Sequence, residues 1–331
     1  GRAIILNSSF TGNSGSSARG QGLLGAAAYN DAAGELQMIN STVKGNSGVN
    51  GGLWNRGIMF LDGSIVEGNT GTGNAAIHNE GTASIQSSAI LGNGSAVLAM
   101  AGGIENYGSM RILGSTVAGN NVGGFFSTGG ILNGGNLSIL NSTIAGNDAI
   151  IGAGGITNLG TIDIVASTIG GNRSNNIGGF NSTGAARVKN SIIAGNICPA
   201  TGNSIPCDGT NRDCAGSGTS LGNNLVGDGT DCSWLGVAGT SDIVGVDPSA
   251  IWEQANSPDN GGPTPTVALL PTSPAIDHIP LENCTDTEGN PITTDQRGTA
   301  RPQGLRCDIG AFEFSLPRGS GFWAHQCSDK G

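Results

Sequence analysis

Residues 115–120 read Ser-Thr-Val-Ala-Gly-Asn, and residues 142–147 read Ser-Thr-Ile-Ala-Gly-Asn. Between these two copies lies a second phrase, Gly129-Gly130-Ile131-Leu132-Asn133. The copies lie 27 residues apart. The return of the same residues at such a period indicates a chain built from repeats rather than an ordinary globular domain.

The repeat covers about the first 196 residues when its copies are aligned on the closing Gly-Asn. Successive Asn residues lie 33, 23, 24, 27, 27, 25 and 24 positions apart, and Ser stands five positions before each of them, as Ser115 and Ser142 do. The Asn column is Asn13, Asn46, Asn69, Asn93, Asn120, Asn147, Asn172 and Asn196. The position eight residues before the Asn is always apolar, as at Ile112, Ile139 and Ile164.

These columns predict a coiled chain in which equivalent residues stack one strand spacing apart. Short apolar/polar alternation is typical of strands with one buried face, and the frequent Gly opposes helices. Gly before each Asn permits a corner of positive φ. Asn side chains stacked at this corner can hydrogen-bond to one another along the stack.

The second phrase forms a parallel set of columns. Its apolar column is Ala28, Leu53, Ile77, Ile104, Ile131 and Ile156, and its Asn column is Asn30, Asn55, Asn79, Asn106, Asn133 and Asn158. Phe180 continues the apolar column, but Asn181 is displaced by one position, so we expect the ladder to slip there. Three strands per circuit of about 25 residues predict an all-β, right-handed parallel β-helix; a β-propeller would need blades of about 40 residues.

Composition agrees with this fold and excludes some partners. The 331 residues include 60 Gly and only 11% charged residues. Residues 1–197 contain eight acidic and eight basic residues, so the whole net charge of −10 lies in residues 198–331. Because the chain has no basic patch, we expect no binding of nucleic acid. We also expect no membrane span and no signal peptide, and a strand at residues 3–6 suggests a processed or truncated chain.

All seven cysteines lie in the irregular C-terminal part. Clustering there predicts disulfides and an extracellular or cell-surface location, and it gives an irregular, disulfide-bearing C-terminal cap. The candidate pairs are Cys198–Cys207, Cys214–Cys232 and Cys284–Cys307, which leave Cys327 over. Zinc is the alternative, but the sequence lacks Cys-x2-Cys, and we expect no metal site of this kind.

Three C-terminal phrases complete the pattern: residues 259–277, Asp295-Gln296-Arg297-Gly298, and residues 307–313. Together with the repeats they closely resemble bacterial choice-of-anchor Q surface proteins, which are grouped with CSLREA-domain proteins. The resemblance reaches about residue 314 and implies a secreted or surface-displayed parallel β-helix without established catalytic residues. The chain lacks the N-terminal CSLREA phrase, and its tail looks like the opening of a further module.

The domain organisation follows from these boundaries. We expect β-helix repeats at 1–197, the last irregular circuits with the cap at 198–314, and a tail or the start of a further module at 315–331. The cap is expected to cover the last circuit, where an open edge would pair with another chain. Asp295, Arg297, Asp308 and Glu313 are expected to form a buried ion-pair network there.

One outward face is the best candidate for a functional surface. The residues between the apolar and Asn columns, or one past the Asn, point outward and include aromatic and charged types. Aromatic rings could stack on a sugar, and a Glu could move a proton. The candidates for this carbohydrate-facing surface are Tyr29, Trp54, Arg56, His78, Glu80 and Glu105. A solvated face with compensating charges is the competing interpretation.

Two further hypotheses concern ligands and function. The stretches 208–213 and 228–231 contain Asp-Gly and could coordinate calcium, although such pairs are more often plain turns; no other cofactor is expected. The preferred function is an extracellular structural or adhesive solenoid (a stalk, an adhesin or the subunit of a head-to-tail filament), with itself or surface glycans as partner. The alternative is a polysaccharide-binding or polysaccharide-degrading enzyme, a lyase or hydrolase.

Overall fold

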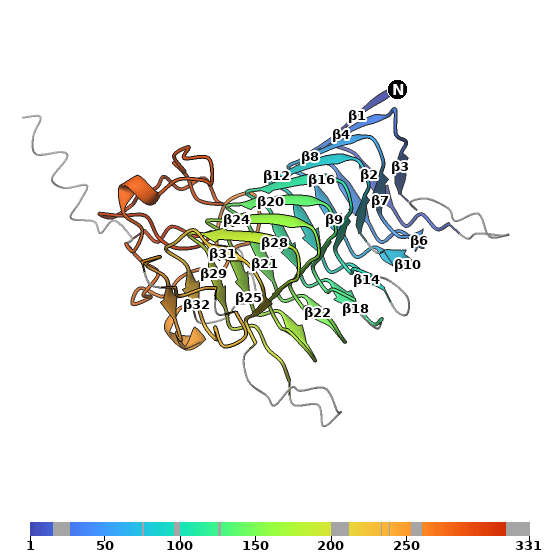
Figure 1. Ribbon diagram of the computed structural model, residues 1–331. Helices are drawn as coiled ribbons and strands as arrows, with labels where there is room; N and C mark the ends of the chain where they lie inside the picture. The colour runs from blue at the N-terminus through green and yellow to red at the C-terminus, as the bar shows by residue number, and fades with distance from the viewer. Residues whose placement is uncertain are drawn as a thin grey trace, which may run out of the picture.

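The computed structural model describes residues 1–15, 27–74, 76–95, 100–124, 127–199, 212–232, 234–237, 239–252 and 260–315. Over these ranges the chain is all-β apart from two short 3-10 helices, η1 (Pro248–Ala250) and η2 (Leu281–Asn283). The strands wind into a coil of stacked parallel circuits, seen side-on in Figure 1. The predicted parallel β-helix is therefore confirmed.

Two of the sheets form long walls of the coil, and within each sheet the pairing is parallel throughout. The nine-stranded sheet consists of β1 (Arg2–Leu6), β4 (Glu35–Ile39), β8 (Ile58–Asp62), β12 (Thr82–Gln86), β16 (Ser109–Leu113), β20 (Asn136–Leu140), β24 (Thr161–Val165), β28 (Ala185–Lys189) and β31 (Thr219–Ser220). The ten-stranded sheet consists of β2 (Ser9–Thr11), β5 (Thr42–Lys44), β9 (Ile65–Glu67), β13 (Ala89–Leu91), β17 (Thr116–Ala118), β21 (Thr143–Ala145), β25 (Thr168–Gly170), β29 (Ile192–Ala194), β32 (Leu225–Val226) and β33 (Ile243–Val244).

The remaining strands form a third wall and a short fourth one. The eight-stranded sheet consists of β3 (Ala28–Asn30), β7 (Leu53–Asn55), β11 (Ile77–Asn79), β15 (Ile104–Asn106), β19 (Ile131–Asn133), β23 (Ile156–Asn158), β27 (Phe180–Ser182) and β30 (Cys214–Gly216). The six-stranded sheet consists of β6 (Ser47–Asn50), β10 (Thr70–Asn74), β14 (Gly94–Ser95), β18 (Asn121–Val122), β22 (Asp148–Ala149) and β26 (Arg173–Ser174). The sequence predicted three strands per circuit, and the structure adds this fourth, short strand after the Gly-Asn corner.

The core is made of apolar residues stacked in register. Ile112 lies opposite Ile139, which lies opposite Ile164 in the next circuit, and all three are fully buried. In β16 the outward Ser109 and Arg111 are exposed, so the alternation predicted from the sequence is the observed one. Each aliphatic side chain buried in this way stabilises the fold by roughly 1.5–3 kcal/mol.

The predicted Asn ladder is present and has a direction. Each Asn donates from Nδ2 to Oδ1 of the Asn one circuit later, at 2.7–2.9 Å, from Asn13 to Asn196. The same Oδ1 accepts the backbone N–H of the preceding Asn, as between Asn120 and Asn147. The last acceptor is Asp213, a carboxylate that has nothing to donate onward.

Two more ladders run beside it. Each Ser of the Ser column accepts the backbone N–H of the Ser before it, from Ser8 to Ser191, and the series ends on Asn224 and then Asp242. In the second Asn ladder Asn158 donates to Ser182 Oγ. Phe180, Asn181 and Ser182 pair with β23 without a shift. The slip expected at Asn181 is therefore wrong, because Ser182 takes the ladder position.

The C-terminal part divides into an end closure and a lateral cover. Trp234 packs edge-on against Phe180 with ring centroids 6.3 Å apart, next to the buried Leu235. Residues 260–315 instead lie along the side of the coil, against the ten-stranded sheet. Gln296 bonds to Thr116 and Thr143 there, and the Ala311 N–H bonds to Thr168. The C-terminal phrases thus cover a flank of the coil that includes β32 and β33, rather than lying over its open end as expected.

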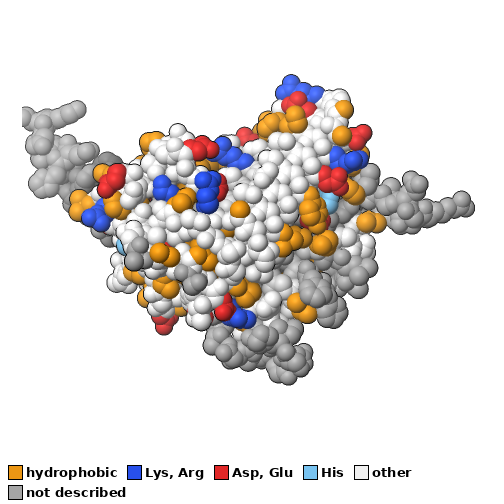
Figure 2. Space-filling model, viewed as in Figure 1, with side chains coloured by type: hydrophobic (Ala, Val, Ile, Leu, Met, Phe, Trp, Pro, Cys, Tyr) orange, Lys and Arg blue, Asp and Glu red, His pale blue; other side chains and the backbone are white. Residues whose placement is uncertain are grey.

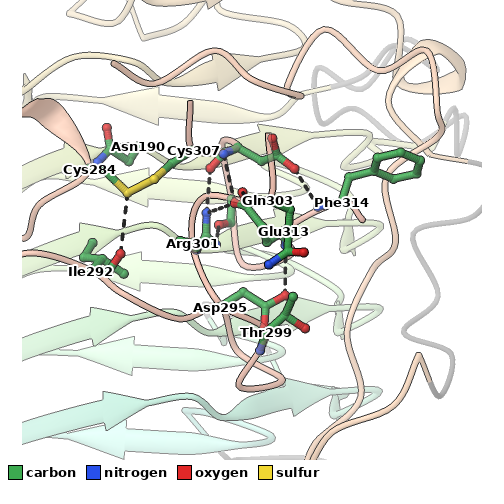
Figure 3. Close-up of polar contacts among 12 residues, drawn as sticks. Asn190, Cys284, Ile292, Asp295, Thr299, Arg301, Gln303, Cys307, Glu313 and Phe314 are labelled. Carbon is green, nitrogen blue, oxygen red and sulfur yellow. Dashed lines mark hydrogen bonds and ion pairs between the residues drawn. A yellow bond between two sulfur atoms is a disulfide. The ribbon is translucent and has the colours of Figure 1, made fainter. Parts of the chain in front are cut away.

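Charges inside this lateral cover are paired. Asp295 binds Arg297 at 2.8 Å, and Glu313 binds Arg301 at 3.1 Å, as Figure 3 shows for the second pair. The Asp308 carboxylate accepts the backbone N–H groups of Asp277 and Phe314. The buried Arg301 donates to the backbone carbonyls of Asp308 and Gly310. Three of the four residues expected in an ion-pair network are therefore in ion pairs, Asp308 is held by backbone N–H groups instead, and Arg301 is a member that the sequence interpretation missed.

Two predicted disulfides are confirmed: Cys214–Cys232 and Cys284–Cys307. Cys198 is buried, but its predicted partner Cys207 and the unassigned Cys327 lie outside the described residues. On the surface, charged side chains are sparse and often sit in pairs of opposite sign (Figure 2). Among the described residues no helix is long and apolar enough to cross a membrane.

Candidate functional surface

The outer face of the eight-stranded sheet brings the predicted residues together near the N-terminal end of the coil. Tyr29, Trp54, His78 and Glu105 are the central residues of β3, β7, β11 and β15, and they stand opposite one another in register. Arg56 and Glu80 follow two residues after Trp54 and His78. All six candidates therefore share one strip, made of two neighbouring columns.

The rings of this strip contact one another edge to face. The Tyr29 and Trp54 centroids are 6.1 Å apart, and those of Trp54 and His78 are 4.8 Å apart. Tyr107, which the sequence interpretation missed, continues the row at 5.9 Å from His78. A signal for Tyr107 was available, because it stands one residue past the Asn column, as Arg56 and Glu80 do.

A continuous series of polar contacts crosses the same strip. His78 Nδ1 lies 2.7 Å from Glu105 Oε2, and His78 Nε2 lies 3.1 Å from Glu80 Oε1. The other Glu80 oxygen binds Arg56 Nε at 3.1 Å. Three successive circuits are thus linked by polar contacts between side chains.

The cluster is graded from buried to exposed. Glu105 is 2% exposed, whereas the Glu80 side chain is 37% exposed. Burial opposes the charged form of His78, but hydrogen bonds and charges from Glu105 and Glu80 outweigh it and raise the pKa of the imidazole. Burial also raises the pKa of Tyr107, and the nearby Glu105 carboxylate adds to this effect. The contacts with Glu105 and Glu80 thus favour the charged form of His78.

The strip loses this character beyond the fourth circuit. Leu132 takes the place of Glu105 and is buried, and Thr157 in the next circuit bonds to Thr128 at 2.7 Å. At the other end Tyr29 is 37% exposed and bonds through its hydroxyl to Asp31. The groups able to meet a ligand are therefore Tyr29, Tyr107, Arg56 and Glu80, and they rest on the buried His78–Glu105 pair.

The second set of candidates, the Asp-Gly stretches, has other partners. Asp228 accepts from the Thr230 N–H and hydroxyl, and Asp231 pairs with Arg212. Asp213 ends the Asn ladder, and residues 208–211 lie outside the described part of the chain. Within the described residues no group of three or more His, Cys, Asp or Glu is placed to hold a metal ion. Calcium binding at these stretches stays a prediction.

Comparison with known proteins adds little to this description. No family model matches the sequence, and no curated protein matches it. Among solved structures the chain is similar to pectate lyase Pel9A, with a TM-score of 0.45 and 13% sequence identity over 92% of this chain and 87% of that one. A likeness this weak carries no argument about function. The resemblance to choice-of-anchor Q proteins likewise stays a prediction.

Proposed function

We propose that this chain is an extracellular β-solenoid with a structural or adhesive role. The observation that carries the proposal is the ladder that links every circuit from Asn13 to Asp213 without a break. Each buried amide bonds to the amide of the next circuit and to a backbone carbonyl of the circuit before, as Asn120 does with Asn147 and Ile90, so loss of a circuit would leave buried polar groups without partners. Such a rod suits a stalk or a surface on which adhesive groups are displayed.

Two further features support an extracellular site of action. Cys214–Cys232 joins β30 to the end closure, and Cys284–Cys307 joins two loops of the lateral cover. Disulfides of this kind persist in oxidising compartments and are rare in the cytosol. They hold together the parts of the chain where no ladder supplies order.

Localisation in the cells that make the protein tests the proposal. Intact cells would be treated with a membrane-impermeant protease and a thiol-reactive maleimide, and the protein would then be followed by immunoblotting. We expect the protein at the cell exterior, where the protease cleaves it or where it is recovered without a maleimide label. Before reduction, the maleimide should not react with Cys214, Cys232, Cys284 or Cys307. Recovery from the cytosol with these thiols free would contradict the proposal. Self-association stays a separate prediction, which electron microscopy of the purified protein tests.

A second function is favoured by one specific observation, the strip from Tyr29 to Tyr107. We propose as an alternative that this strip binds polysaccharide or degrades it. Exposed rings offer faces and edges for sugar C–H groups, and the Glu105–His78–Glu80 series provides a route by which a proton could reach the surface. In this arrangement Glu80 is the group that meets substrate, and His78 and Glu105 position it.

Product release from pectin, alginate and other acidic glycans tests this alternative, with Glu80→Gln as the main variant and Glu105→Gln beside it. Glu67→Gln is the matched control, because Glu67 is similarly exposed and binds Lys44 of the preceding circuit at 3.1 Å, as Glu80 binds Arg56. Loss of activity in Glu80→Gln but not in the control Glu67→Gln would support a degrading enzyme. Binding lost in Tyr29→Ala without any product release would support a binding surface.

A further inference from the structure

The outer face of the first three strands of the nine-stranded sheet differs from the rest of that wall. The inward residues of these strands, such as Met59 and Leu61, are buried, so the residues between them point outward. Nine outward side chains stand in register, three on each strand, and are termed here the outer grid. They are Arg2, Ile4 and Leu6 on β1; Glu35, Gln37 and Ile39 on β4; and Ile58, Phe60 and Asp62 on β8.

Five members of the outer grid are apolar, and four of these are strongly exposed. The exposed fractions are 51% at Ile4, 54% at Leu6, 45% at Ile58 and 40% at Phe60. Ile58 and Phe60 have a paired strand on both sides, so their exposure is not that of a sheet edge. The next circuit has Thr82 and Ser84 at the same two positions. The exposed apolar surface of the grid amounts to about 400 Å², a size at which patches often mark an interaction site.

Farther along the same wall, outward apolar residues are covered by another segment. Leu140 and Val165 lie in the column that begins with Leu6 and Ile39, and they pack against Ile292 of the lateral cover. The lateral cover is thus an established interface on this wall. No described segment covers Ile58 or Phe60 in the same way, since both keep two fifths or more of their surface exposed.

Charged side chains stand at two opposite corners of the grid. Arg2, at the first position of the first strand, is 56% exposed and pairs with Glu35 at 3.1 Å. Asp62, at the last position of the third strand, is exposed, and its carboxylate makes no ion pair with any residue in the described part of the chain. A partner that fits this face therefore brings a cation to Asp62, an anion to Arg2 and apolar side chains between them.

A second copy of the same face meets these requirements. Two copies packed face to face are related by a two-fold axis that lies in the interface. An axis along the diagonal through Leu6, Gln37 and Ile58 places Arg2 opposite Asp62 of the other copy, twice, and Ile4 opposite Ile39. Glu35 then lies against Phe60 of the other copy and keeps its bond from Gln37.

The other simple axes do not fit. An axis along the strands places Arg2 on Ile58 and Asp62 on Leu6, and an axis along the coil places Arg2 on Leu6 and Asp62 on Ile58. The second diagonal places Arg2 on Arg2 and Asp62 on Asp62, which juxtaposes like charges. Charge complementarity therefore selects one arrangement of two copies.

We propose that this chain forms a two-fold dimer through the outer grid, with the two nine-stranded sheets face to face. Strand rise and strand spacing set the crossing angle of the two sheets at roughly 70°. About 400 Å² of apolar surface per copy is half of the roughly 800 Å² that a standard interface buries, so we expect a dissociation constant of order 10 μM. The inference goes beyond the proposed scaffold role, which would stand if the chain proved monomeric.

Sedimentation equilibrium of the whole chain, at concentrations below and above this value, tests the proposal. Ile58→Thr and Phe60→Ser give each position the residue that Thr82 or Ser84 has one circuit later, so the fold should be kept. Each is expected to weaken association about tenfold or more, because an exposed apolar anchor is lost. Leu159→Thr is the matched control: Leu159 is 55% exposed near a different wall, and its loss should leave association unchanged.

Reversal of the corner charges tests the axis itself. Asp62→Arg would place two cations opposite each other and should weaken association about tenfold, and adding Arg2→Asp should restore it. Circular dichroism shows that each variant is folded. The proposal is overturned if the parent is monomeric throughout, if Ile58→Thr and Phe60→Ser associate as the parent does, or if the double charge variant stays as weak as Asp62→Arg. A monomeric parent that binds phosphatidylcholine vesicles through Phe60 would overturn it in favour of a lipid surface.

Discussion

On the ten-stranded sheet, the outward side chains of the first three circuits are larger and more exposed than those of the later circuits. One outward column of the ten-stranded sheet runs through Lys44, Glu67, Leu91, Ala118, Ala145, Gly170 and Ala194. Lys44 is exposed and Glu67 is half-buried, whereas Ala118 to Ala194 are buried, beneath Trp252 and the lateral cover. At Gly170 even a Cβ would lie 2.9 Å from the Trp252 ring.

This difference changes how the repeat is understood. The Ala of the phrase Ser-Thr-Ile-Ala-Gly-Asn looks like part of a repeat consensus, but in the structure it is small because another segment lies on it. The Thr of the same phrase is buried for the same reason: Thr116 and Thr143 both bond to Gln296. A repeat therefore records two constraints, the stacking of circuits and the covering of one flank.

A charged side chain in the buried part of this column should have the largest effect on the free energy of unfolding. Ala145→Lys would place an ammonium group at a position that is 1% exposed, beneath an apolar cluster. We expect a loss of about 3 kcal/mol or more in the free energy of unfolding, because a buried unpaired charge is among the costliest changes. Urea denaturation measures it. A loss below about 1 kcal/mol would show that the cover lifts from the sheet easily.

Changing the pH should act mainly on the later part of the chain, because Asp213 and Asp308, whose pKa values burial raises, both lie there. Burial raises the pKa of Asp308 to about 7, with a further contribution from Glu313, and burial raises the pKa of Asp213 to about 6. Both values exceed those of an unfolded chain, so the stability they contribute is present at low pH and is lost as the pH rises through about 6 and 7. The melting temperature should therefore be higher at pH 5 than at pH 8.

Asp308→Asn identifies the group responsible. The variant should lose much of this pH dependence, while Asp62→Asn, an exposed residue of the open circuits, should keep it. A melting temperature that rises from pH 5 to pH 8 in the parent protein would reverse the sign and contradict the assignment. The size of the change is of order 1–3 kcal/mol, since each unit of pKa difference is worth about 1.4 kcal/mol and part of it is offset elsewhere.

Removing the side chain that joins the cover to the wall should have an intermediate effect. Gln296 is 3% exposed and bonds to Thr116, Thr143 and Thr264. Gln296→Ala should cost about 1–3 kcal/mol, because it leaves buried hydroxyls short of partners. Hydrogen exchange should rise in residues 260–315 and not in β4 or β8. Gln37→Ala is the matched control, because the half-buried Gln37 amide bonds to Glu35 in a circuit that the cover does not reach.

The sequence predicted the repeating part well because its contacts are periodic. Ile112, Ile139 and Ile164 recur at the spacing of the circuits, and so do the ladder Asn residues, so columns in the sequence become columns in space. The strip of Tyr29, Trp54, His78 and Glu105 followed for the same reason. Its internal pairing did not, because the length of each side chain decides whether His78 reaches Glu105, Glu80 or solvent.

The lateral cover was beyond the reach of the same method. Gln296 contacts Thr143 across 153 residues of sequence, and a single contact of that kind leaves no period to find. Arg301 also gave no signal, since its partners Asp308 and Glu313 are set by a loop that is not part of the repeat. The sequence did hold one sign of a covering segment, the small residues at 118, 145, 170 and 194. Because they recur at the spacing of the repeat, they were interpreted as part of it.

The smallest expected effect on the free energy of unfolding comes from the uncovered part of the same column, at Glu67 and Lys44. Glu67→Ala removes a surface ion pair between Glu67, whose side chain is 42% exposed, and Lys44, whose side chain is 54% exposed. Exposed pairs of this kind contribute about 0–1 kcal/mol, so the free energy of unfolding should change by less than about 0.5 kcal/mol. Ala145→Lys and Glu67→Ala thus occupy one column three circuits apart, and urea denaturation should give them effects that differ severalfold. Similar losses in both variants would mean that the open circuits are also covered in solution, by a segment or partner that shields Glu67 and Lys44 from water.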